Sequence, residues 1–196
     1  MKDLCIVILA AGQGSRYQAV AGVGADKLLA PCLGLDGQQR PVLEQVLVNL
    51  QGVPGRRVLV TRPERGAVIA LAQAYGCEVL SLDSPGMGDS IAAAVRMSAD
   101  EVGWLVVLGD MPFIRPETLS LLAASIMDEK ISVAQCGDAY GHPVGFGRAF
   151  AAQLAALTGD RGGRQLFQAG NVQQIVVEDR GVLWDVDTPA ALNFER

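Results

Sequence analysis

The sequence lacks the residue patterns of a cysteine- or histidine-based metal site. Its four cysteines, Cys5, Cys32, Cys77 and Cys136, are far apart and form no Cys-x-x-Cys pair, which argues against zinc. His142 is the only histidine, and a single histidine is more often structural than catalytic. The chemistry of this chain must therefore come mainly from other residue types.

Long hydrophobic runs and an excess of positive charge are also missing. No apolar stretch approaches the roughly 20 residues of a membrane-spanning helix. The run Leu4–Ala11 leads into glycines rather than a cleavage site, which favours a strand over a signal peptide. The formal net charge is −5 without a basic stripe, which argues against a nucleic-acid partner. We therefore expect a cytoplasmic protein that acts on small molecules, with no membrane contact.

What the sequence does contain is a regular alternation of apolar runs and helical patterns. Half of the 196 residues are apolar, and we find no repeat or linker, so we expect one domain over residues 1–196. The expected strands are Leu4–Leu9, Arg57–Thr61, Glu78–Ser81, Trp104–Leu108, Ile131–Gln135 and Gln174–Glu178. The expected helices lie near Val42–Leu50, Glu64–Ala74, Ser90–Ala99, Pro116–Met127 and Arg148–Leu157. This alternation predicts an α/β fold with a mostly parallel sheet covered on both faces.

A glycine loop follows the first expected strand at once. Leu9, Ala10, Ala11 and Gly12 continue into Gly14 and Arg16, and Lys27 comes eleven residues after Arg16. Glycines let backbone N–H groups approach phosphate oxygens, and cations stabilise charge at an attacked phosphorus. The third glycine of the dinucleotide fingerprint and the Walker A Gly-Lys-Ser/Thr are both missing. The pattern indicates another kind of triphosphate site or, alternatively, a plain strand-to-helix turn.

Carboxylates occur at two further places where expected strands end. Asp110 follows the apolar run Val106–Leu108, and Asp185 and Asp187 alternate along an extended segment, which puts them on the same side. Mg²⁺ prefers carboxylate and phosphate oxygens, so Asp110 and either Asp187 or Asp185 are candidate metal ligands. Asp110 could instead cap the next helix, and Asp187 or Thr188 could cap the last one.

Three glycine-containing segments could complete a binding site. Gly86, Gly88 and Ser90 could hold a base or a ribose, or form a glycine turn and a helix cap. The segments Gly137–Gly147 and Thr158–Gly163 are glycine-rich and polar, so we expect functional loops or turns there. The two arginines of Gly159–Arg164, Arg161 and Arg164, suit an anionic substrate, although a solvated loop between helices would have the same composition.

The ordered set of motifs resembles the molybdenum cofactor nucleotidyltransferases. Within the MobA-like NTP transferases, the resemblance is strongest to the molybdenum cofactor cytidylyltransferases, and it covers essentially the whole chain. Its motifs are Leu9-Ala10-Ala11-Gly12-x-Gly14-x-Arg16, Lys27-Leu28-Leu29-x-Pro31, Gly86-Met87-Gly88-x-Ser90, Leu108-Gly109-Asp110-Met111-Pro112, Gly141-His142-Pro143-Val144-x-Phe146, Gly159-Asp160-Arg161-Gly162 and Asp185-x-Asp187-Thr188-Pro189.

The resemblance implies a Rossmann-like, three-layer α/β/α fold of the nucleotide-diphospho-sugar transferase type. It also implies transfer of CMP from CTP to molybdopterin, with release of pyrophosphate. The product, molybdopterin cytosine dinucleotide, goes to molybdenum hydroxylases of the xanthine dehydrogenase type, so transient contact with such an apoenzyme is expected. The related guanylyltransferases usually have glycine where this chain has Ala11, which favours CTP over GTP.

The same resemblance assigns roles to the motif residues. Arg16, Lys27 and Asp110 are the expected catalytic residues, and Asp110 and Asp187 are expected to hold Mg²⁺. The expected nucleotide-binding residues are Leu9, Ala10, Ala11, Gly12, Gly14, Arg16, Lys27, Gly86, Gly88 and Ser90. The residues expected to contact the pterin side are Gly141, His142, Pro143, Asp160 and Arg161.

Two other functions fit parts of the pattern. A guanylyltransferase, or an enzyme that transfers a nucleotide to an alcohol or sugar phosphate, would share the glycine loop. A carrier without catalytic activity would hold finished molybdenum cofactor and pass it to an apoenzyme. The presence of Arg16, Lys27 and Asp110 together argues for catalysis.

Overall fold

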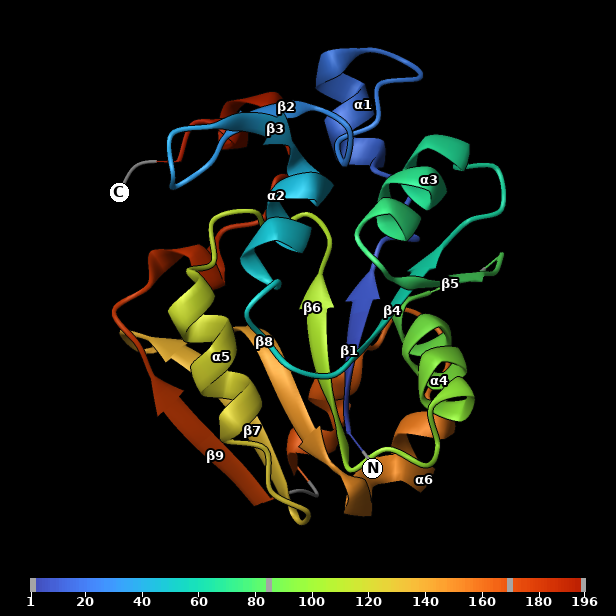
Figure 1. Ribbon diagram of the computed structural model, residues 1–196, viewed down its shortest axis with the longest axis vertical. Coiled ribbons are helices and arrows are strands. Elements are labelled where there is room, and N and C mark those ends of the chain that lie inside the picture. The colour runs from blue at the N-terminus through green and yellow to red at the C-terminus, as the bar shows by residue number, and fades with distance from the viewer. Residues whose placement is uncertain (1–2, 84–85, 169–170, 195–196) are drawn as a thin grey trace.

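A seven-stranded β-sheet runs through the middle of the computed structural model, which describes residues 3–83, 86–168 and 171–194 (Figure 1). The strand order is β5-β4-β1-β6-β8-β7-β9. The strands are β1 (Leu4–Leu9), β4 (Arg56–Thr61), β5 (Glu78–Ser81), β6 (Gly103–Leu108), β7 (Lys130–Cys136), β8 (Ala139–Gly147) and β9 (Asn171–Val176). A separate two-stranded sheet pairs β2 (Pro31–Leu33) with β3 (Gln39–Pro41).

Most neighbouring strands run parallel, and one strand does not. In the centre of the sheet, Ile8 lies between Leu59 of β4 and Val107 of β6. β8 is antiparallel to both of its neighbours, so Val144 lies beside Val106 of β6 and Val133 of β7. The sheet is therefore mostly parallel, as the alternating sequence pattern predicts.

Helices cover both faces of the sheet and make the fold a three-layer, Rossmann-like α/β arrangement (Figure 1). The helices are α1 (Ser15–Ala21), α2 (Val42–Asn49), α3 (Gly66–Ala74), α4 (Met87–Met97), α5 (Pro116–Ala124) and α6 (Ala151–Ala155). Side chains alternate between the two faces of a strand. In β1, Ile6 and Ile8 pack with α2, α3 and α5, whereas Cys5 and Val7 pack with α4 and α6.

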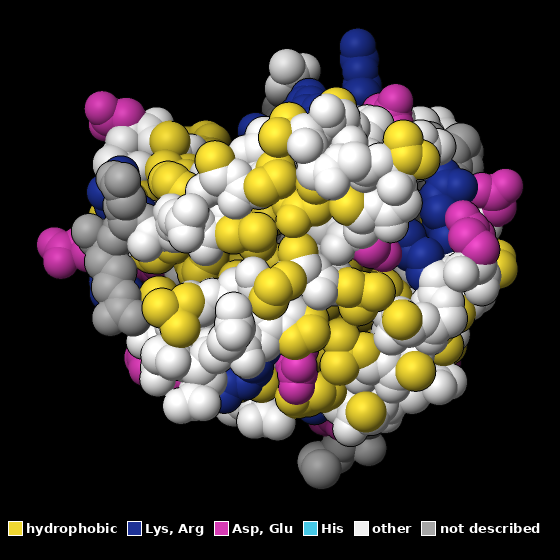
Figure 2. All heavy atoms as spheres, turned by 90° about the horizontal axis from the view of Figure 1, so that it is seen from above, with side chains coloured by type: hydrophobic (Ala, Val, Ile, Leu, Met, Phe, Trp, Pro, Cys, Tyr) yellow, Lys and Arg dark blue, Asp and Glu magenta, His cyan; other side chains and the backbone are white. Residues whose placement is uncertain are grey.

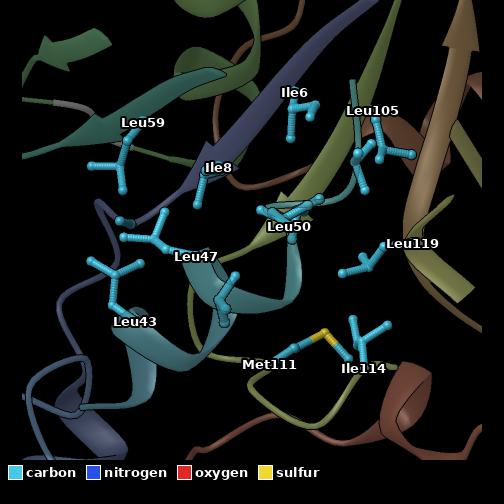
Figure 3. Close-up of a cluster of buried hydrophobic side chains, with 14 of the residues drawn as sticks. Ile6, Ile8, Leu43, Leu47, Leu50, Leu59, Leu105, Met111, Ile114 and Leu119 are labelled. Atoms are coloured by element: carbon cyan, nitrogen blue, oxygen red, sulfur yellow. The ribbon is translucent and has the colours of Figure 1, made fainter. Parts of the chain in front are cut away.

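The first of these two hydrophobic clusters shows how the helices are fixed (Figure 3). Leu43, Leu47 and Leu50 come from α2 and its C-terminus and are almost completely buried against the sheet. Their spacing of three and four residues puts them on one side of a helix. This packing fixes α2 against the sheet.

Comparison with the expected elements confirms the predicted helices and most strands to within a few residues, with one clear error. The segment Gly137–Gly147 is not a functional loop, because its residues from Ala139 onward form β8. Its glycines provide close packing: a Cβ on Gly141 would lie 2.1 Å from the carbonyl oxygen of Val182. The helix α1 and the β2–β3 hairpin carry no strong pattern and were not predicted.

The last predicted strand and the helices also need small corrections. The strand expected at Gln174–Glu178 is β9, which begins three residues earlier and ends at Val176. The helix expected from Ser90 begins at Met87, and the one expected over Arg148–Leu157 is a short 3₁₀ turn followed by α6. Across the described ranges, none of the helices is both long and apolar enough to cross a bilayer.

Candidate functional site

The first candidate site is a cavity of about 590 Å³ at the edge where β1 and β6 end. Figure 2 looks down on the molecule from above, and hydrophobic side chains gather across much of this face. The cavity is lined by Leu9, Ala10, Ala11, Gly12, Gln13, Ser15, Lys27, Leu28, Arg62, Gly86, Met87, Ser90, Leu108, Asp110 and Asp160. Nine of the expected site residues are therefore in one place: Leu9, Ala10, Ala11, Gly12, Lys27, Gly86, Ser90, Asp110 and Asp160.

In the glycine loop, the backbone carbonyl groups and the backbone N–H groups differ in their hydrogen bonding. The carbonyl oxygens of Ala10, Ala11 and Gly12 all accept hydrogen bonds from arginine side chains. By contrast, no described residue accepts a hydrogen bond from the N–H groups of Ala11 through Ser15. Gly12, Gln13 and Ser15 are also exposed, so this loop offers a row of donors within reach of a ligand with several oxygen acceptors.

Four charged side chains meet beside this loop. The Lys27 ammonium lies 2.5 Å from Asp110 Oδ2 and 3.0 Å from Asp187 Oδ1. Arg16 Nη1 lies 2.7 Å from the other oxygen of Asp187. The structure thus joins residues that are up to 171 positions apart in the chain, as expected if the strand ends share one edge.

The cluster controls the protonation of its members. Burial alone would lower the pKa of Lys27, but its contact with Asp110, and then Asp187, raises that pKa above its usual value. Burial alone would raise the pKa of Asp187, but Lys27 and Arg16 lower it. Burial, followed by repulsion from Asp187, raises the pKa of Asp185. Lys27 therefore lies between the carboxyl groups of Asp110 and Asp187, and Arg16 pairs with Asp187 alone.

Neither aspartate of this cluster is a helix cap. Asp187 uses both carboxylate oxygens for Lys27 and Arg16, and Thr188 makes no side-chain cap hydrogen bond. Asp110 lies well before α5, whose N-terminal cap position is Arg115. The capping alternatives for these two aspartates are therefore wrong.

One oxygen of the cluster fits a bound cation. Asp110 Oδ1 is buried and makes no hydrogen bond to any residue that the structure describes, which is costly unless another group binds it. Within the same described ranges, no group of three His, Cys, Asp or Glu residues could hold a metal. A divalent cation here would therefore rely on one or two carboxylates plus ligand oxygens, which is the usual manner of Mg²⁺.

Gly86, just before α4, and Gly88, within it, allow close packing that the sequence motif did not predict. A Cβ on Gly86 would lie 2.3 Å from backbone atoms of Gly159, and one on Gly88 would lie 2.9 Å from carbonyl oxygens of the same loop. The Gly88 N–H donates to the Gly159 carbonyl, and Asp89 Oδ2 accepts from the Gly159 N–H. These contacts fasten the start of α4 to the loop Thr158–Gly163.

Two expectations for the start of α4 are wrong or incomplete: Ser90 was a candidate helix cap, and Gly88 was expected to line the nucleotide site. Ser90 lies inside the first turn of α4 and donates to the Gly86 carbonyl, so it does not cap the helix. It nevertheless lines the cavity, whereas Gly88 does not. Gly14 is also outside the lining; it adopts a left-handed conformation with φ of 66°, and a Cβ added there would lie 3.8 Å from the Lys27 side chain.

A second cavity of about 580 Å³ adjoins the first and shares Met87 and Asp160 with it. Its lining is Met87, Ile91, Val106, His142, Val144, Phe146, Asp160, Arg161, Gly162, Gly163, Arg164, Gln165 and Gln168. Of the residues expected on the pterin side, His142, Asp160 and Arg161 line it, whereas Gly141 and Pro143 do not. The lining combines apolar side chains, such as Ile91, Val144 and Phe146, with the arginines Arg161 and Arg164 and the amides of Gln165 and Gln168.

His142 is neutral in this second cavity. Burial, helped by the positive charge of Arg164, lowers the pKa of its imidazole to about 4. Its Nδ1 atom is buried without a hydrogen-bond partner among the described residues. A neutral imidazole can accept a hydrogen bond from a ligand N–H, so His142 does not need to be a proton-transfer residue.

Sequence reasoning missed two residues of the first site. Arg62 and Arg65 follow β4 in a turn and reach the carbonyls of the glycine loop. Nothing in the local sequence distinguishes them from surface arginines. The only available signal was that β4 is expected to lie beside β1, which brings the two strand ends together.

Comparisons with known proteins place this site in a recognised group. Residues 6–175 match the MobA-like NTP transferase domain. The bifunctional protein GlmU of Thiobacillus denitrificans is 33% identical over 147 residues, and that of Aromatoleum aromaticum is 31% identical over 145 residues. These alignments cover 74% and 73% of this chain but only 30% of each relative.

Solved structures show the same fold over nearly the whole chain. Rv0371c from Mycobacterium tuberculosis has a TM-score of 0.77 at 27% identity, covering 97% of this chain and 95% of its own. A nucleotidyl transferase from Methanothermobacter has a TM-score of 0.76 at 20% identity, covering 96% and 94%. A manganese complex of Rv0371c has a TM-score of 0.68 at 25% identity, covering 89% and 88%. The chain belongs to the MobA-like NTP transferases, a family of nucleotidyltransferases.

Proposed function

We propose that this protein transfers CMP from CTP to molybdopterin, forming molybdopterin cytosine dinucleotide and releasing pyrophosphate. The observation that carries the proposal is the pair of adjoining cavities. One has unpaired N–H groups and a lysine–carboxylate cluster, and the other has an apolar wall, a neutral histidine and arginines. Two cavities with a common wall suit two substrates that react with each other.

The first cavity suits the triphosphate. The N–H groups of Ala11 through Ser15 can donate to phosphate oxygens. Lys27 stabilises negative charge on the α-phosphate and on the departing pyrophosphate. Arg16, whose side chain is 81% exposed, can turn from Asp187 toward the same charge at little cost.

The second cavity suits the acceptor. Molybdopterin combines a planar, nitrogen-rich ring system with a terminal phosphate, so it needs an apolar wall, hydrogen-bond partners and positive charge. His142 offers an acceptor for a ring N–H, and Phe146 and Val144 offer apolar surface. In the described part of the chain, no carboxylate forms an ion pair with Arg161 or Arg164. Arg164 Nη2 donates to the Tyr140 carbonyl, and the remaining donors of the two guanidinium groups can bind an anionic group.

The reaction itself needs positioning and electrostatics rather than a strong base. An oxygen of the molybdopterin phosphate bonds to the α-phosphorus of CTP, and the bond from that phosphorus to the pyrophosphate oxygen breaks. The nucleophile is already an anion, so no proton has to be removed. Positioned substrates and stabilised charge account for most of such phosphoryl chemistry.

Asp110 and Asp187 are the residues that would hold Mg²⁺. The unpartnered Asp110 Oδ1 supports this choice, and Asp185 is disfavoured because its raised pKa reflects burial and repulsion from Asp187. When bound, the metal supplies positive charge to the phosphate oxygens. A relative of known structure was crystallised with manganese, which supports a divalent cation in this family.

The choice of CTP and of the recipient protein rests on the sequence resemblance. Ala11 lines the first cavity and stands where related guanylyltransferases have glycine, which favours CTP. Delivery of the product implies transient contact with an apo-molybdoenzyme of the xanthine dehydrogenase type.

The decisive experiment measures pyrophosphate release with Mg²⁺ and molybdenum cofactor, in parallel with CTP, GTP, ATP and UTP. We expect release with CTP. Release with GTP instead would keep the reaction and overturn the role of Ala11. Tight cofactor binding without pyrophosphate release from any nucleotide would indicate a carrier and contradict the proposal.

A further inference from the structure

We propose that Arg62 and Arg65 are positioning residues that orient the peptide groups of the glycine loop and thereby set its affinity for a triphosphate. The inference rests on triphosphate binding in the first cavity. It does not depend on which base or which acceptor the enzyme uses.

The contacts between the two arginines and the loop form a continuous series. Arg65 Nη1 donates to the Ala10 carbonyl at 3.0 Å, and Arg65 Nη2 donates to the Gly12 carbonyl at 2.6 Å. Arg62 Nε donates to the Ala11 carbonyl between them at 3.0 Å. Three successive carbonyl oxygens are therefore bound by two guanidinium groups from one turn.

Binding a carbonyl also fixes the N–H of the next residue. A trans peptide unit is planar, and its C=O and N–H bonds point in opposite directions. A carbonyl of Ala10 that points to Arg65 therefore turns the N–H of Ala11 away from it. By the same argument, the carbonyls of Ala11 and Gly12 direct the N–H groups of Gly12 and Gln13.

These three N–H groups are among those without an acceptor in the described residues. Glycine residues such as Gly12 have wide backbone freedom, so the loop could turn its peptide groups either way in the absence of an external contact. A loop that has lost that freedom before the ligand arrives binds more tightly, because less conformational entropy is lost on binding. The arginines therefore preorganise the donors.

The arginines are themselves well anchored. Their side chains are only 18% and 14% exposed. Arg62 Nη1 pairs with Asp83 at 3.0 Å, and Arg65 Nε lies 3.9 Å from Asp26. The hydroxyl of Thr61 adds a further hydrogen bond to the Ala10 carbonyl at 3.2 Å. The turn after β4 thus acts as a rigid support for the turn after β1.

A simpler explanation is that the two arginines attract phosphate by charge alone. Lysine and glutamine substitutions separate the two explanations. Lysine keeps the charge but cannot donate from a planar fork to the Ala10 and Gly12 carbonyls together. If orientation matters, Arg65→Lys loses affinity almost as Arg65→Gln does.

The experiment measures dissociation constants of CTP and of inorganic tripolyphosphate by calorimetry, with the melting temperature of each variant recorded alongside. The variants are R65Q, R65K, R62Q and the control R56Q. Arg56 lies at the opposite end of the same strand and forms a comparable ion pair, with Glu78 at 2.7 Å. We expect R65Q and R65K each to bind both compounds about tenfold or more weakly, a loss of roughly 1.4 kcal/mol, and R56Q to bind as the wild type does.

Turnover gives a second readout that a general loss of structure would not produce. We expect R65K and R62Q to raise the KM for CTP and to leave the KM for the acceptor unchanged, because only the first cavity is altered. Wild-type affinity in R65K, or in folded R65Q, would overturn the inference. If R65Q does not fold, R65K and R62Q decide the question. A wild type that prefers another nucleotide, with the Arg65 dependence intact, would overturn the proposed function and leave this inference standing.

Discussion

The two cavities that meet at Met87 and Asp160 are built in opposite ways. The first is bounded by a backbone loop and by Lys27 and Asp110, which belong to a cluster of four paired charges whose other members, Arg16 and Asp187, lie outside the cavity lining. The second is bounded by apolar side chains and a histidine whose low pKa keeps it neutral. Under the proposed function, nucleotide binding would depend on charge and peptide orientation, whereas acceptor binding would depend on shape and on burial of polar groups. Variants on either side of this contrast, and one at the wall that the two cavities share, test it.

The largest expected effect comes from Lys27, the centre of the charged site. Lys27→Ala removes the ammonium that bridges Asp110 and Asp187 and leaves the two carboxylates facing each other. We expect kcat to fall by about 10²–10³-fold, the range seen when a group that stabilises transition-state charge is removed. Pyrophosphate release measures the loss. Lys130→Ala, at the N-terminal end of β7, is the control and should have the wild-type kcat. A wild-type kcat in Lys27→Ala would show that the Lys27 charge does not contribute to catalysis.

A glycine substitution at the wall between the cavities should affect both. A Cβ on Gly86 would lie 2.3 Å from the backbone of Gly159, so Gly86→Ala must push α4 and the loop apart. We expect stability to fall by about 1–3 kcal/mol, typical of overpacking, and both KM values to rise. Gly52→Ala is the control, since a Cβ there would have no neighbour within 4 Å. Equal stability of the two variants in thermal unfolding would contradict the close packing.

His142 should affect the acceptor side alone. His142→Ala removes one hydrogen-bond acceptor from the second cavity, so we expect the KM for the cofactor to rise by about fivefold, corresponding to roughly 1 kcal/mol, with little change for CTP. Because the pKa of His142 is about 4, the imidazole should not contribute to any change in this KM between pH 6 and 8. A change that His142→Ala abolishes would show that the imidazole titrates in that range.

The same pKa has a consequence for folding stability. Unfolded His142 takes up a proton near its usual pKa of 6.5, whereas folded His142 does so only at about 4. Since the unfolded state then binds more protons, the free energy of unfolding should fall as the pH drops from about 6.5 toward 4. Chemical denaturation across this range should show a smaller fall in His142→Ala.

The smallest effect is expected for the stability contribution of Arg16. Its ion pair with Asp187 is short, but the Arg16 side chain is 81% exposed, and such pairs contribute less than about 1 kcal/mol. Arg16→Ala should therefore melt close to the wild type while its turnover falls. A large drop in melting temperature would show that the charged site also holds the fold together.

The part of the site that was predictable from the sequence is the part formed by strand ends. The glycine loop and Asp110 directly follow β1 and β6, and the carboxyl ends of parallel strands meet at one edge. Lys27 and Asp187 lie outside the strands and were expected at the site from the motifs that contain them. The fold class followed from the same alternation. The bounds of β1 and β5 were predicted without error.

What could not be predicted depends on contacts between distant segments. Gly141, Gly145 and Gly147 looked like loop residues, yet they are strand positions where another segment lies too close for a Cβ. Gly86 and Gly88 were expected to contact the nucleotide. The structure shows that both lack a Cβ where the backbone of the loop at Gly159 packs closely against them. Similarly, the support from Arg62 and Arg65 to the glycine loop spans more than 50 residues of sequence.

The reversed direction of β8 has a consequence for how such an enzyme can diversify. Because β8 runs against β6, its first residues, including His142, come back to the edge where β6 ends. The hairpin of β7 and β8 is continuous in the chain and contributes no residue to the charged cluster. Under the proposed function, changes confined to this hairpin would alter His142, Val144 and Phe146 on the acceptor side and leave the charged cluster intact.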